Sequence, residues 1–285
     1  MRRGLRLAIA GWPVEHSLSP ALWEAMGRRR GLAIEYGIVP VRPDDDEPWL
    51  ALWASDLDAF NVTAPWKERA VRRCQRLDPV ASAIDAVNTV IRARDGWQGR
   101  STDGYGFVRS LLSIGEPLSG RAIAILGTGG GGRAVALAAV ESGADVTLVS
   151  RRPERVPPGC EVCRVVGYAA LDDVDPRPFE ILVNATPLGR HAGAPIPDVP
   201  PWIWERARLV VDLNYAPLVT ALLRVARAAG ARTLNGMGML IHQACLGAAW
   251  LIDGDPVAAE SYEEDFWAAA REVVPELDPW IEGRE

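Results

Sequence analysis

Short apolar runs alternate with helical patterns along the first hundred residues of the chain. The apolar runs predict β-strands at 5–11, 34–41, 59–63 and 87–93. The segments between them predict helices at 20–30, 47–56 and 65–76. Strands and helices that alternate in this way are typical of an α/β layer, in which helices cover a sheet.

A second alternating block starts with a predicted helix at 104–114. Its predicted strands are at 122–126, 145–149, 180–185 and 209–213, with a further candidate around 231–234. A helix is predicted from residue 132, and the tail from 237 to 273 is helical by pattern. The strands are continuous apolar runs, as expected for a parallel sheet that is covered on both faces. A chain of 285 residues therefore suggests two α/β domains of ordinary size, or one large one.

The composition is that of a globular protein, with 48% hydrophobic and 24% charged residues. The formal net charge of −6 and the scattered arginines argue against binding to nucleic acid. The apolar run near the N-terminus stops at Gly11 and Pro13, and is too short for a secretion signal or a membrane span. We therefore expect a cytoplasmic protein that binds neither nucleic acid nor a membrane.

The cysteines and histidines do not predict a metal site. The four cysteines are Cys74, Cys160, Cys163 and Cys245. The C-x-x-C pair at 160–163 has no second pair to complete it, and histidines occur only at 16, 191 and 242. Because a zinc site needs about four ligands at suitable spacing, we predict no bound metal and reduced thiols.

The segment AIAILGTGGGGRA (122–134) carries a nucleotide-binding motif. Its glycines are Gly127, Gly129, Gly130, Gly131 and Gly132, and the first, second and last of these satisfy G-x-G-x-x-G. Such a loop turns tightly and brings backbone N–H groups against a pyrophosphate at a helix N-terminus. The motif alone is weak, but here it follows a predicted strand, opens a helix and precedes a second strand. It predicts dinucleotide binding rather than a flexible glycine linker.

The second strand of this block ends in Ser150, Arg151 and Arg152. A site for NAD usually has an acidic residue here, which binds the ribose 2′-hydroxyl. A hydroxyl and two guanidinium groups instead suit a 2′-phosphate, so NADP is the predicted cofactor. The alternative is a pair of ordinary solvated arginines in an arginine-rich chain.

Lys67 is the only lysine in the chain, and the other 30 of the 31 basic side chains are arginine. Arginine stays protonated, whereas an ammonium group can exchange a proton, so lysine at this position suggests an acid or a base. Pro65 suits the first position of a helix, which would place Lys67 in the first turn. A cation there is unfavourable because the helix dipole already presents positive charge. We therefore predict a functional role, against the alternative of a chance lysine on a solvated face.

Eight short motifs between residue 11 and about residue 245 carry a resemblance to a known family. They are GWPVEHSLSP, FNVTAPWKERA, DAVNTV, STDGYGF, GTGGGGRA, VNATPLG, DLNYAPLVTALL and NGMGMLIHQA. In this order and spacing they resemble the shikimate dehydrogenase family. The resemblance implies a substrate-binding α/β domain of residues 1–104, completed by C-terminal helices in 237–285. It also implies a doubly wound, Rossmann-like NADP-binding domain of residues 105–236.

The resemblance further implies that Lys67 and Asp103 form the catalytic pair of an NADP-dependent oxidoreductase. Lys67 would exchange the proton of the substrate hydroxyl in step with hydride transfer, and Asp103 would hydrogen-bond the same hydroxyl and orient the ammonium. The alternative for Asp103 is an N-cap of the helix that follows, and the two roles can coexist.

Other positions match the family's substrate and cofactor contacts. Ser17 and Ser19, helped by Tyr215, would bind the substrate carboxylate, although two serines in a proline-bounded loop also occur in simple turns. The implied ligands of the ring hydroxyls are Thr63, Asn88 and Gln243. The implied neighbours of the cofactor are Ala185, Leu213, Gly236 and Met239.

The chain departs from the family's usual motifs at Asp85, Ser101, Ser150, Arg152 and Arg190. None of these changes removes a catalytic group. The resemblance thus implies reversible reduction of 3-dehydroshikimate to shikimate with NADPH, in chorismate and aromatic amino acid biosynthesis, by a monomer or homodimer. Two alternatives stay open. One is a quinate or amino-shikimate dehydrogenase, and the other is a non-catalytic NADP-binding sensor that would be expected to have lost Lys67 or Asp103.

Overall fold

The computed structural model of the protein describes residues 4–173 and 179–277, and the chain divides into two compact units. The first, which we call the N-terminal unit, comprises Met1–Gly106 and Leu240–Glu285. The second, the central unit, comprises Phe107–Met239. Each unit is built on its own six-stranded sheet.

The sheet of the N-terminal unit is mixed and has the strand order β2-β1-β3-β5-β6-β4. Its strands are β1 (Leu5–Gly11), β2 (Ile34–Pro40), β3 (Ala59–Val62), β4 (Arg76–Leu77), β5 (Thr89–Ala93) and β6 (Gly96–Arg100). Strand β1 runs parallel to β2 and β3, whereas β5 is antiparallel to β3 and β6. The four strands predicted in this region are confirmed, but β4 and β6 were not predicted.

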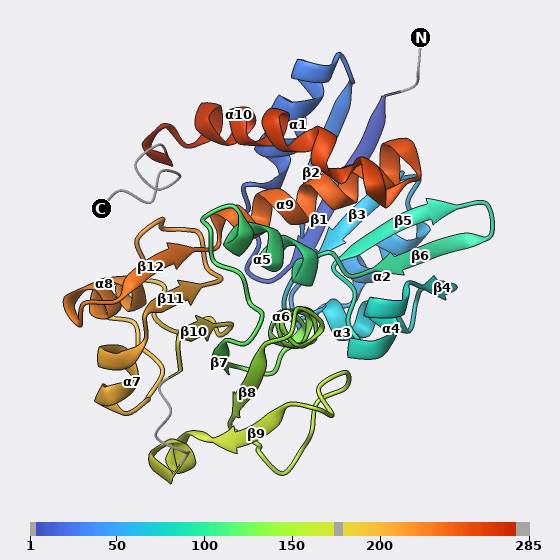
Figure 1. Ribbon diagram of the computed structural model, residues 1–285. Coiled ribbons are helices and arrows are strands. Elements are labelled where there is room, and N and C mark those ends of the chain that lie inside the picture. Colours follow the sequence, from blue (N-terminus) through green and yellow to red (C-terminus); the bar gives the residue numbers. More distant parts are fainter. Residues whose placement is uncertain (1–3, 174–178, 278–285) are drawn as a thin grey trace. The chain divides into compact units, whose positions relative to one another are not determined.

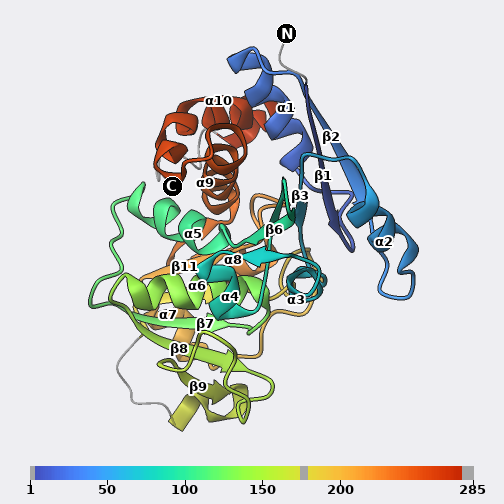
Figure 2. The same cartoon turned by 90° about the vertical axis from the view of Figure 1, so that its right-hand side faces the viewer.

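Helices cover both faces of this sheet. They are α1 (Ser19–Arg30), α2 (Glu47–Ala54), α3 (Lys67–Val71), α4 (Pro79–Ile84), α9 (Met237–Ala248) and α10 (Glu263–Val273). Alternate residues of the strands, such as Ala8 and Ala10, pack with Trp49 of α2 and Trp66 beside α3 in one aromatic-rich core. On the other side of β1 and β2 lies α1, which packs against α10 (Figure 2).

Two helix predictions in this unit were wrong in extent. The helix predicted at 65–76 is the five-residue α3, and Pro65 lies before its N-cap residue Trp66 rather than at its first position. The tail predicted as helical from 237 to 273 is interrupted after α9 by a π-helical turn (Ala249–Asp253) and a 3₁₀ helix (Pro256–Tyr262). Gly254, with φ of 70°, ends the π-helical turn, because its left-handed conformation cannot continue a helix.

The sheet of the central unit is fully parallel, with the order β12-β11-β10-β7-β8-β9 (Figure 1). Its strands are β7 (Ala122–Leu126), β8 (Asp145–Ser150), β9 (Arg164–Gly167), β10 (Ile181–Asn184), β11 (Leu209–Asp212) and β12 (Arg232–Asn235). Its helices are α5 (Asp103–Leu112, of which the part from Phe107 belongs to this unit), α6 (Gly130–Glu141), α7 (Pro201–Arg206) and α8 (Ala221–Ala228), with a 3₁₀ helix at Tyr168–Asp173. This order is that of a doubly wound dinucleotide-binding fold, as predicted, although β9, α7 and α8 were not predicted.

The apolar strands of the central unit are buried on both faces. In β7, Ile123 and Ile125 enter a core that includes Phe107 of α5 and Val135 of α6. The intervening Ala124 and Leu126 enter a second core, formed with residues of α7 and α8. This two-sided burial explains why the sequence has continuous apolar runs here instead of alternation.

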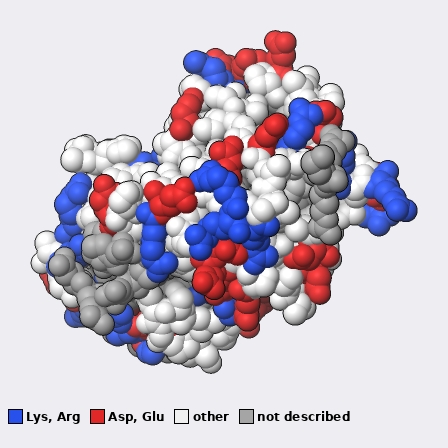
Figure 3. Space-filling view, turned by 90° about the horizontal axis from the view of Figure 1, so that it is seen from above, with Lys and Arg blue, Asp and Glu red and all other residues white. Residues whose placement is uncertain are grey.

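Charged side chains of both signs are interspersed on the face shown in Figure 3. Within the described residues, no helix is long and apolar enough to cross a membrane. Across the same part of the chain, no group of three or more His, Cys, Asp or Glu side chains is arranged to hold a metal ion.

Candidate active site

Lys67 and Asp103 form an ion pair in the N-terminal unit. Lys67 Nζ donates to Asp103 Oδ2 at 2.5 Å, and the two side chains are 18% and 10% exposed. Each is the first residue of its helix, α3 or α5. The carbonyl of Thr102 accepts the N–H of Gly106 at 3.0 Å, so Thr102 rather than Asp103 has the N-cap position. The Asp103 carboxylate is therefore free of the capping role and is directed to Lys67.

Asn88 connects this ion pair to a buried polar cluster. Its Nδ2 donates to Asp103 Oδ1 and to Thr102 Oγ1, both at 2.9 Å. Thr102 Oγ1 in turn donates to Gln243 Oε1 at 3.1 Å, and Asn88 Oδ1 accepts the Thr102 N–H at 2.8 Å. All four side chains are buried. The structure thus brings together the predicted residues Lys67, Asp103, Asn88 and Gln243.

Thr63 lies where the carboxyl ends of β1 and β3 meet. Its N–H donates to the carbonyl of Ala10 at 2.8 Å. A Cβ atom at Gly11 would come within 2.2 Å of Thr63 Cγ2, so this approach requires glycine at position 11. Because β1 and β3 are parallel neighbours, the loops after them leave the same edge of the sheet. This edge carries Thr63 and Lys67 after β3, and the serine loop after β1.

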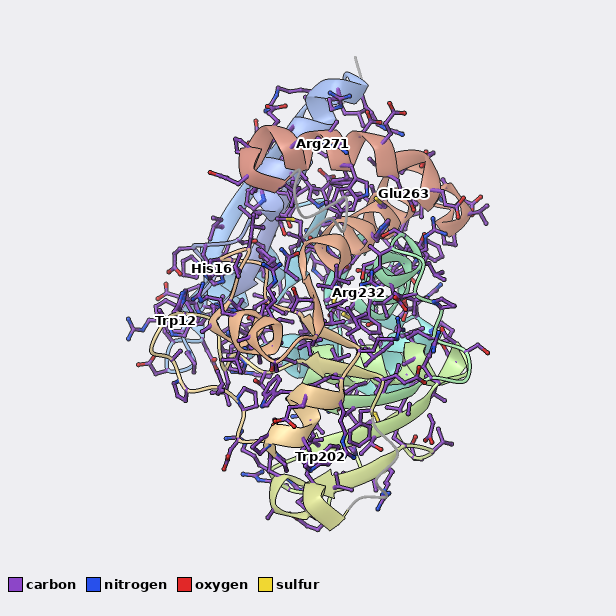
Figure 4. The ribbon with its side chains drawn as sticks, turned by 60° about the vertical axis from the view of Figure 1, so that its left-hand side comes forward. Trp12, His16, Trp202, Arg232, Glu263 and Arg271 are labelled. Atoms are coloured by element: carbon purple, nitrogen blue, oxygen red, sulfur yellow. The ribbon has the colours of Figure 1, made fainter. Side chains whose placement is uncertain are left out.

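The two predicted carboxylate ligands lie at the start of α1, in the loop marked by Trp12 and His16 in Figure 4. Ser17 Oγ accepts the Ser19 N–H at 3.3 Å, and the Ser17 N–H donates to the Val14 carbonyl at 3.0 Å. The turn chemistry considered as the alternative is therefore present. The Ser17 hydroxyl can still donate a hydrogen bond, and the start of a 12-residue helix carries partial positive charge. Both properties suit a carboxylate.

The glycine loop of the central unit connects β7 to α6. Gly127 has φ of +101°, and a Cβ atom at Gly132 would lie 2.2 Å from the Gly127 carbonyl oxygen. Gly129 is the N-cap of α6, and a Cβ atom there would meet nothing within 4 Å. Protein packing therefore explains Gly127 and Gly132 but not Gly129, and the absence of a side chain at Gly129 leaves room for the close approach of a pyrophosphate. Gly130 and Gly131 form the first turn of α6, which begins earlier than the predicted residue 132.

Ser150 is the last residue of β8, and its side chain is buried, with Oγ accepting the Arg152 N–H at 3.0 Å. Arg151 and Arg152 are exposed. Burial raises the pKa of Tyr168, which follows β9, and the charge of nearby Arg151 lowers it in part. Among the residues that the structure describes, no carboxylate forms an ion pair with Arg151 or Arg152, so both guanidinium groups can bind a phosphate.

The remaining predicted cofactor neighbours lie at the carboxyl ends of three adjacent strands. Ala185 follows β10, Leu213 follows β11 and Gly236 follows β12. A Cβ atom at Gly236 would lie 2.1 Å from the Leu213 carbonyl oxygen, so these two loops touch through their backbones. Met239 is buried in the core shared with α5 and α6. In doubly wound sheets a dinucleotide binds at this edge, where the strand order reverses between β7 and β10.

Sequence reasoning missed Asp212, which is fully buried at the end of β11. Its Oδ2 accepts the Thr220 hydroxyl at 2.6 Å, and its Oδ1 accepts Asn184 Nδ2 and the Asn214 N–H, both at 3.1 Å. Burial raises the pKa of Asp212, and these hydrogen bonds oppose the rise. The carboxylate thus fixes the loops after β10 and β11, including Asn214 directly before Tyr215. Asp212 could have been predicted from the sequence, because an aspartate at the end of the apolar run LVVD is unusual.

Two further residues of the N-terminal unit were not predicted. Thr102 is fully buried and connects Asn88 to Gln243. Asp78 is the N-cap of α4, and its Oδ2 accepts the Ser101 N–H at 3.2 Å, which holds the segment before Asp103. Tyr215 belongs to the central unit, so its contact with the same carboxylate as Ser17 and Ser19 stays a prediction.

Comparison with known proteins gives matches over most of the chain. Residues 9–90 match a family model described as the shikimate dehydrogenase substrate binding domain. A protein of Xanthomonas oryzae pv. oryzae named shikimate dehydrogenase (NADP(+)) is 38% identical over 266 residues, which cover 89% of this chain and 94% of that protein. One with the same name from Stenotrophomonas maltophilia is 37% identical, over 84% of this chain and 88% of its own.

Solved structures agree with these sequence matches. The Thermus thermophilus shikimate 5-dehydrogenase, solved in complex with NADP(H) and shikimate, superposes with a TM-score of 0.76 at 34% identity, covering 93% of this chain and 99% of that one. Shikimate dehydrogenase 1 of Peptoclostridium difficile superposes with a TM-score of 0.81 over 95% of this chain and 99% of its own. At 23% identity, that second match supports the fold alone. With sequence identity of this level over nearly the full length of its relatives, the chain belongs to the shikimate dehydrogenase family.

Proposed function

We propose that the protein is an NADP-dependent shikimate dehydrogenase that interconverts 3-dehydroshikimate and shikimate. The observation that carries the proposal is the Lys67–Asp103 ion pair, which is braced by Asn88 in a chain whose relatives are named shikimate dehydrogenase (NADP(+)). The sensor alternative is disfavoured because both residues of the pair are retained and are in contact.

The chemistry divides between the cofactor and the protein. NADPH supplies the hydride that reduces the substrate's carbonyl carbon. Lys67 donates a proton to the oxygen of that carbonyl, which becomes the hydroxyl of shikimate, and takes the proton back in the reverse direction. Asp103 keeps the ammonium in place through the 2.5 Å hydrogen bond and accepts a hydrogen bond from the same hydroxyl.

Neutral polar side chains bind the remaining groups of the substrate, which are its ring hydroxyls and its carboxylate. Thr63, Asn88 and Gln243 supply donors and acceptors for the ring hydroxyls, each of which would lose about 1–3 kcal/mol if it were buried without a partner. Ser17 and Ser19, with Tyr215, bind the carboxylate. The proposal therefore makes the N-terminal unit the substrate-binding domain.

The central unit is the proposed NADP-binding domain. The Gly129–Gly132 turn at the start of α6 fits a pyrophosphate, and the backbone at Ala185, Leu213 and Gly236 borders the rest of the cofactor. The free guanidinium groups of Arg151 and Arg152 would pair with the 2′-phosphate.

Initial rates with shikimate, quinate and amino-shikimate, each measured with NADP and with NAD, test the proposal. The expected result is the highest kcat/KM with shikimate and NADP. A higher kcat/KM with quinate or amino-shikimate would show that this compound, rather than shikimate, is the substrate. No turnover with any of the six pairs, in protein that binds NADP, would favour the sensor.

A further inference from the structure

The cysteines of the C-x-x-C sequence lie side by side in the loop between β8 and β9. The N–H of Cys163 donates to the carbonyl of Cys160 at 3.0 Å, which closes a turn over residues 160–163. The ends of a β-turn have Cα atoms less than about 7 Å apart, and a disulfide spans about 4.4–6.8 Å between Cα atoms. The folded loop therefore already holds the two cysteines at a Cα separation that a disulfide bond can span.

The two thiols differ in access and in reactivity. Cys160 is fully buried and belongs to the core of the central unit, whereas Cys163 is only partly buried and follows Val162, which is 77% exposed. The hydrogen bond between the thiols lowers the pKa of Cys163 and raises that of Cys160, and burial raises the Cys160 pKa further. Because the thiolate is the reactive form, a reagent from solvent meets Cys163 first.

We propose that Cys160 and Cys163 are an oxidative modification site that reacts with small-molecule disulfides and closes to an intramolecular disulfide. The Cys163 thiolate attacks one sulfur of the reagent, which forms a mixed disulfide and releases one thiol. Cys160 Sγ then attacks Cys163 Sγ and displaces the second thiolate, which takes up the Cys160 proton and leaves as a thiol. In total, the two cysteines give up two protons and two electrons, and the reagent is reduced to two thiols.

The Cys160–Cys163 disulfide would cross-link two positions of the loop that begins with Arg151 and Arg152. Since the turn already has a suitable geometry, we infer that closing the disulfide leaves the backbone of this loop in place. If the loop binds the 2′-phosphate, which rests on the proposed function, the oxidised enzyme keeps its affinity for NADP. The cross-link restricts the unfolded chain, so it also raises the temperature of thermal unfolding.

The test uses the full chain, first reduced and then exposed to glutathione disulfide, with intact-mass measurement and peptide mapping. We expect the loss of two hydrogen atoms, a Cys160–Cys163 bond and full reversal by dithiothreitol. Cys74 and Cys245 are matched controls, because burial raises the pKa of Cys74 to about 12 and Cys245 is fully buried. Both should stay reduced. Cys160→Ser should stop at a stable glutathione adduct on Cys163, and Cys163→Ser should leave Cys160 unmodified.

A persistent glutathione adduct on Cys163 of the wild-type protein would overturn the proposal, since it would show that Cys160 does not complete the exchange. Equal reaction at Cys74 or Cys245 would overturn it as well. The mass result does not depend on catalysis, so it stands apart from any failure of the proposed dehydrogenase activity. In the oxidised enzyme KM for NADP should stay within about twofold of the reduced value, because the turn already fits disulfide geometry. A tenfold rise would contradict the inference that the loop stays in place.

Discussion

Lys67 Nζ and Asn88 Nδ2 donate to the two different carboxylate oxygens of Asp103, at 2.5 and 2.9 Å. The carboxylate is therefore fixed from both sides, and the ammonium has one defined position at the start of α3. A cation is unfavourable at that end of a helix, so helix stability does not explain the lysine. The position of Lys67 beside a fixed carboxylate does explain the lysine, if its ammonium group exchanges a proton.

We expect Lys67→Arg to lower kcat by about 10²–10⁴-fold, the usual contribution of general acid–base catalysis. Arginine keeps the charge and can pair with Asp103, but a guanidinium group does not release a proton at workable pH. Steady-state kinetics with shikimate and NADP measures the effect, and circular dichroism checks the fold. Lys67→Met, which removes the charge and the exchangeable proton together, should lower kcat at least as much. A Lys67→Arg variant with kcat within about threefold of wild type, far below the general-acid range, would mean that only charge is needed.

Arg151→Ala should reduce kcat/KM for NADP and leave kcat/KM for NAD nearly unchanged. The guanidinium is exposed and, in the described part of the chain, forms no ion pair, so a 2′-phosphate would be its main partner. Loss of one charge-assisted hydrogen bond predicts a decrease of roughly tenfold or more. Arg155→Ala, an exposed arginine of the same loop, is the matched control and should change neither value. An equal loss with both cofactors would rule out recognition of the 2′-phosphate by Arg151.

The cofactor domain could be predicted from sequence because its signals are local. The glycine loop, the strand before it and the helix after it lie within about twenty residues, and each follows a rule of backbone geometry. Helix α8 had such signals as well, since Thr220 caps its start by accepting the Leu223 N–H at 3.2 Å. It could have been found by the same reasoning. By contrast, β6 (GWQGR) was hidden by two glycines, which are depleted in strands, although Asp95-Gly96 marked the hairpin turn.

The polar cluster beside the ion pair could not be derived from local pattern. Asn88 and Gln243 are 155 positions apart, and their side chains meet only because α9 folds back to the unit that contains β5. The family resemblance supplied these two residues, but it did not supply Thr102, which connects them. A buried threonine in a short loop has no distinctive sequence pattern, so only its contacts reveal its importance.

Thr102→Val should destabilise the protein by about 1–3 kcal/mol, because it keeps the shape but removes the buried hydroxyl that accepts from Asn88 Nδ2 and donates to Gln243 Oε1. Gln243 Oε1 would keep only the longer contact with Asn88 Nδ2, at 3.4 Å. The two amides would then be less well oriented, so KM for shikimate should rise more than kcat falls. Denaturant unfolding and steady-state kinetics measure the two effects. Ser113→Ala is a suitable control, since that hydroxyl bonds its own helix end, at the Ser110 carbonyl, and lies outside the polar cluster. Wild-type stability and KM in Thr102→Val would show that the hydroxyl does not organise the cluster.

The acid sensitivity of the fold should depend on Glu116 of the central unit. Its carboxylate is 5% exposed, pairs with Arg208 at 2.5 and 2.7 Å, and pairs with Arg232 (Figure 4) at 2.5 Å. The hydrogen bond from Arg208 is the main cause that lowers the pKa of Glu116 below its ordinary value of 4.5; Arg232 adds to it and burial opposes it. A group whose pKa is lower in the folded state stabilises the fold above the unfolded pKa, and this contribution is lost as pH falls through the folded pKa.

Glu116→Gln should therefore be less stable than wild type at pH 7, and the difference should shrink between about pH 5 and pH 3. The wild-type free energy of unfolding should fall more steeply over this range, because Glu116 binds a proton more readily in the unfolded chain than in the folded one, whereas the glutamine binds none. Urea unfolding at a series of pH values measures both curves. Glu205→Gln, at an exposed glutamate of α7, is the control and should follow the wild-type slope. Parallel curves for wild type and Glu116→Gln would show that the acid response arises at other carboxylates.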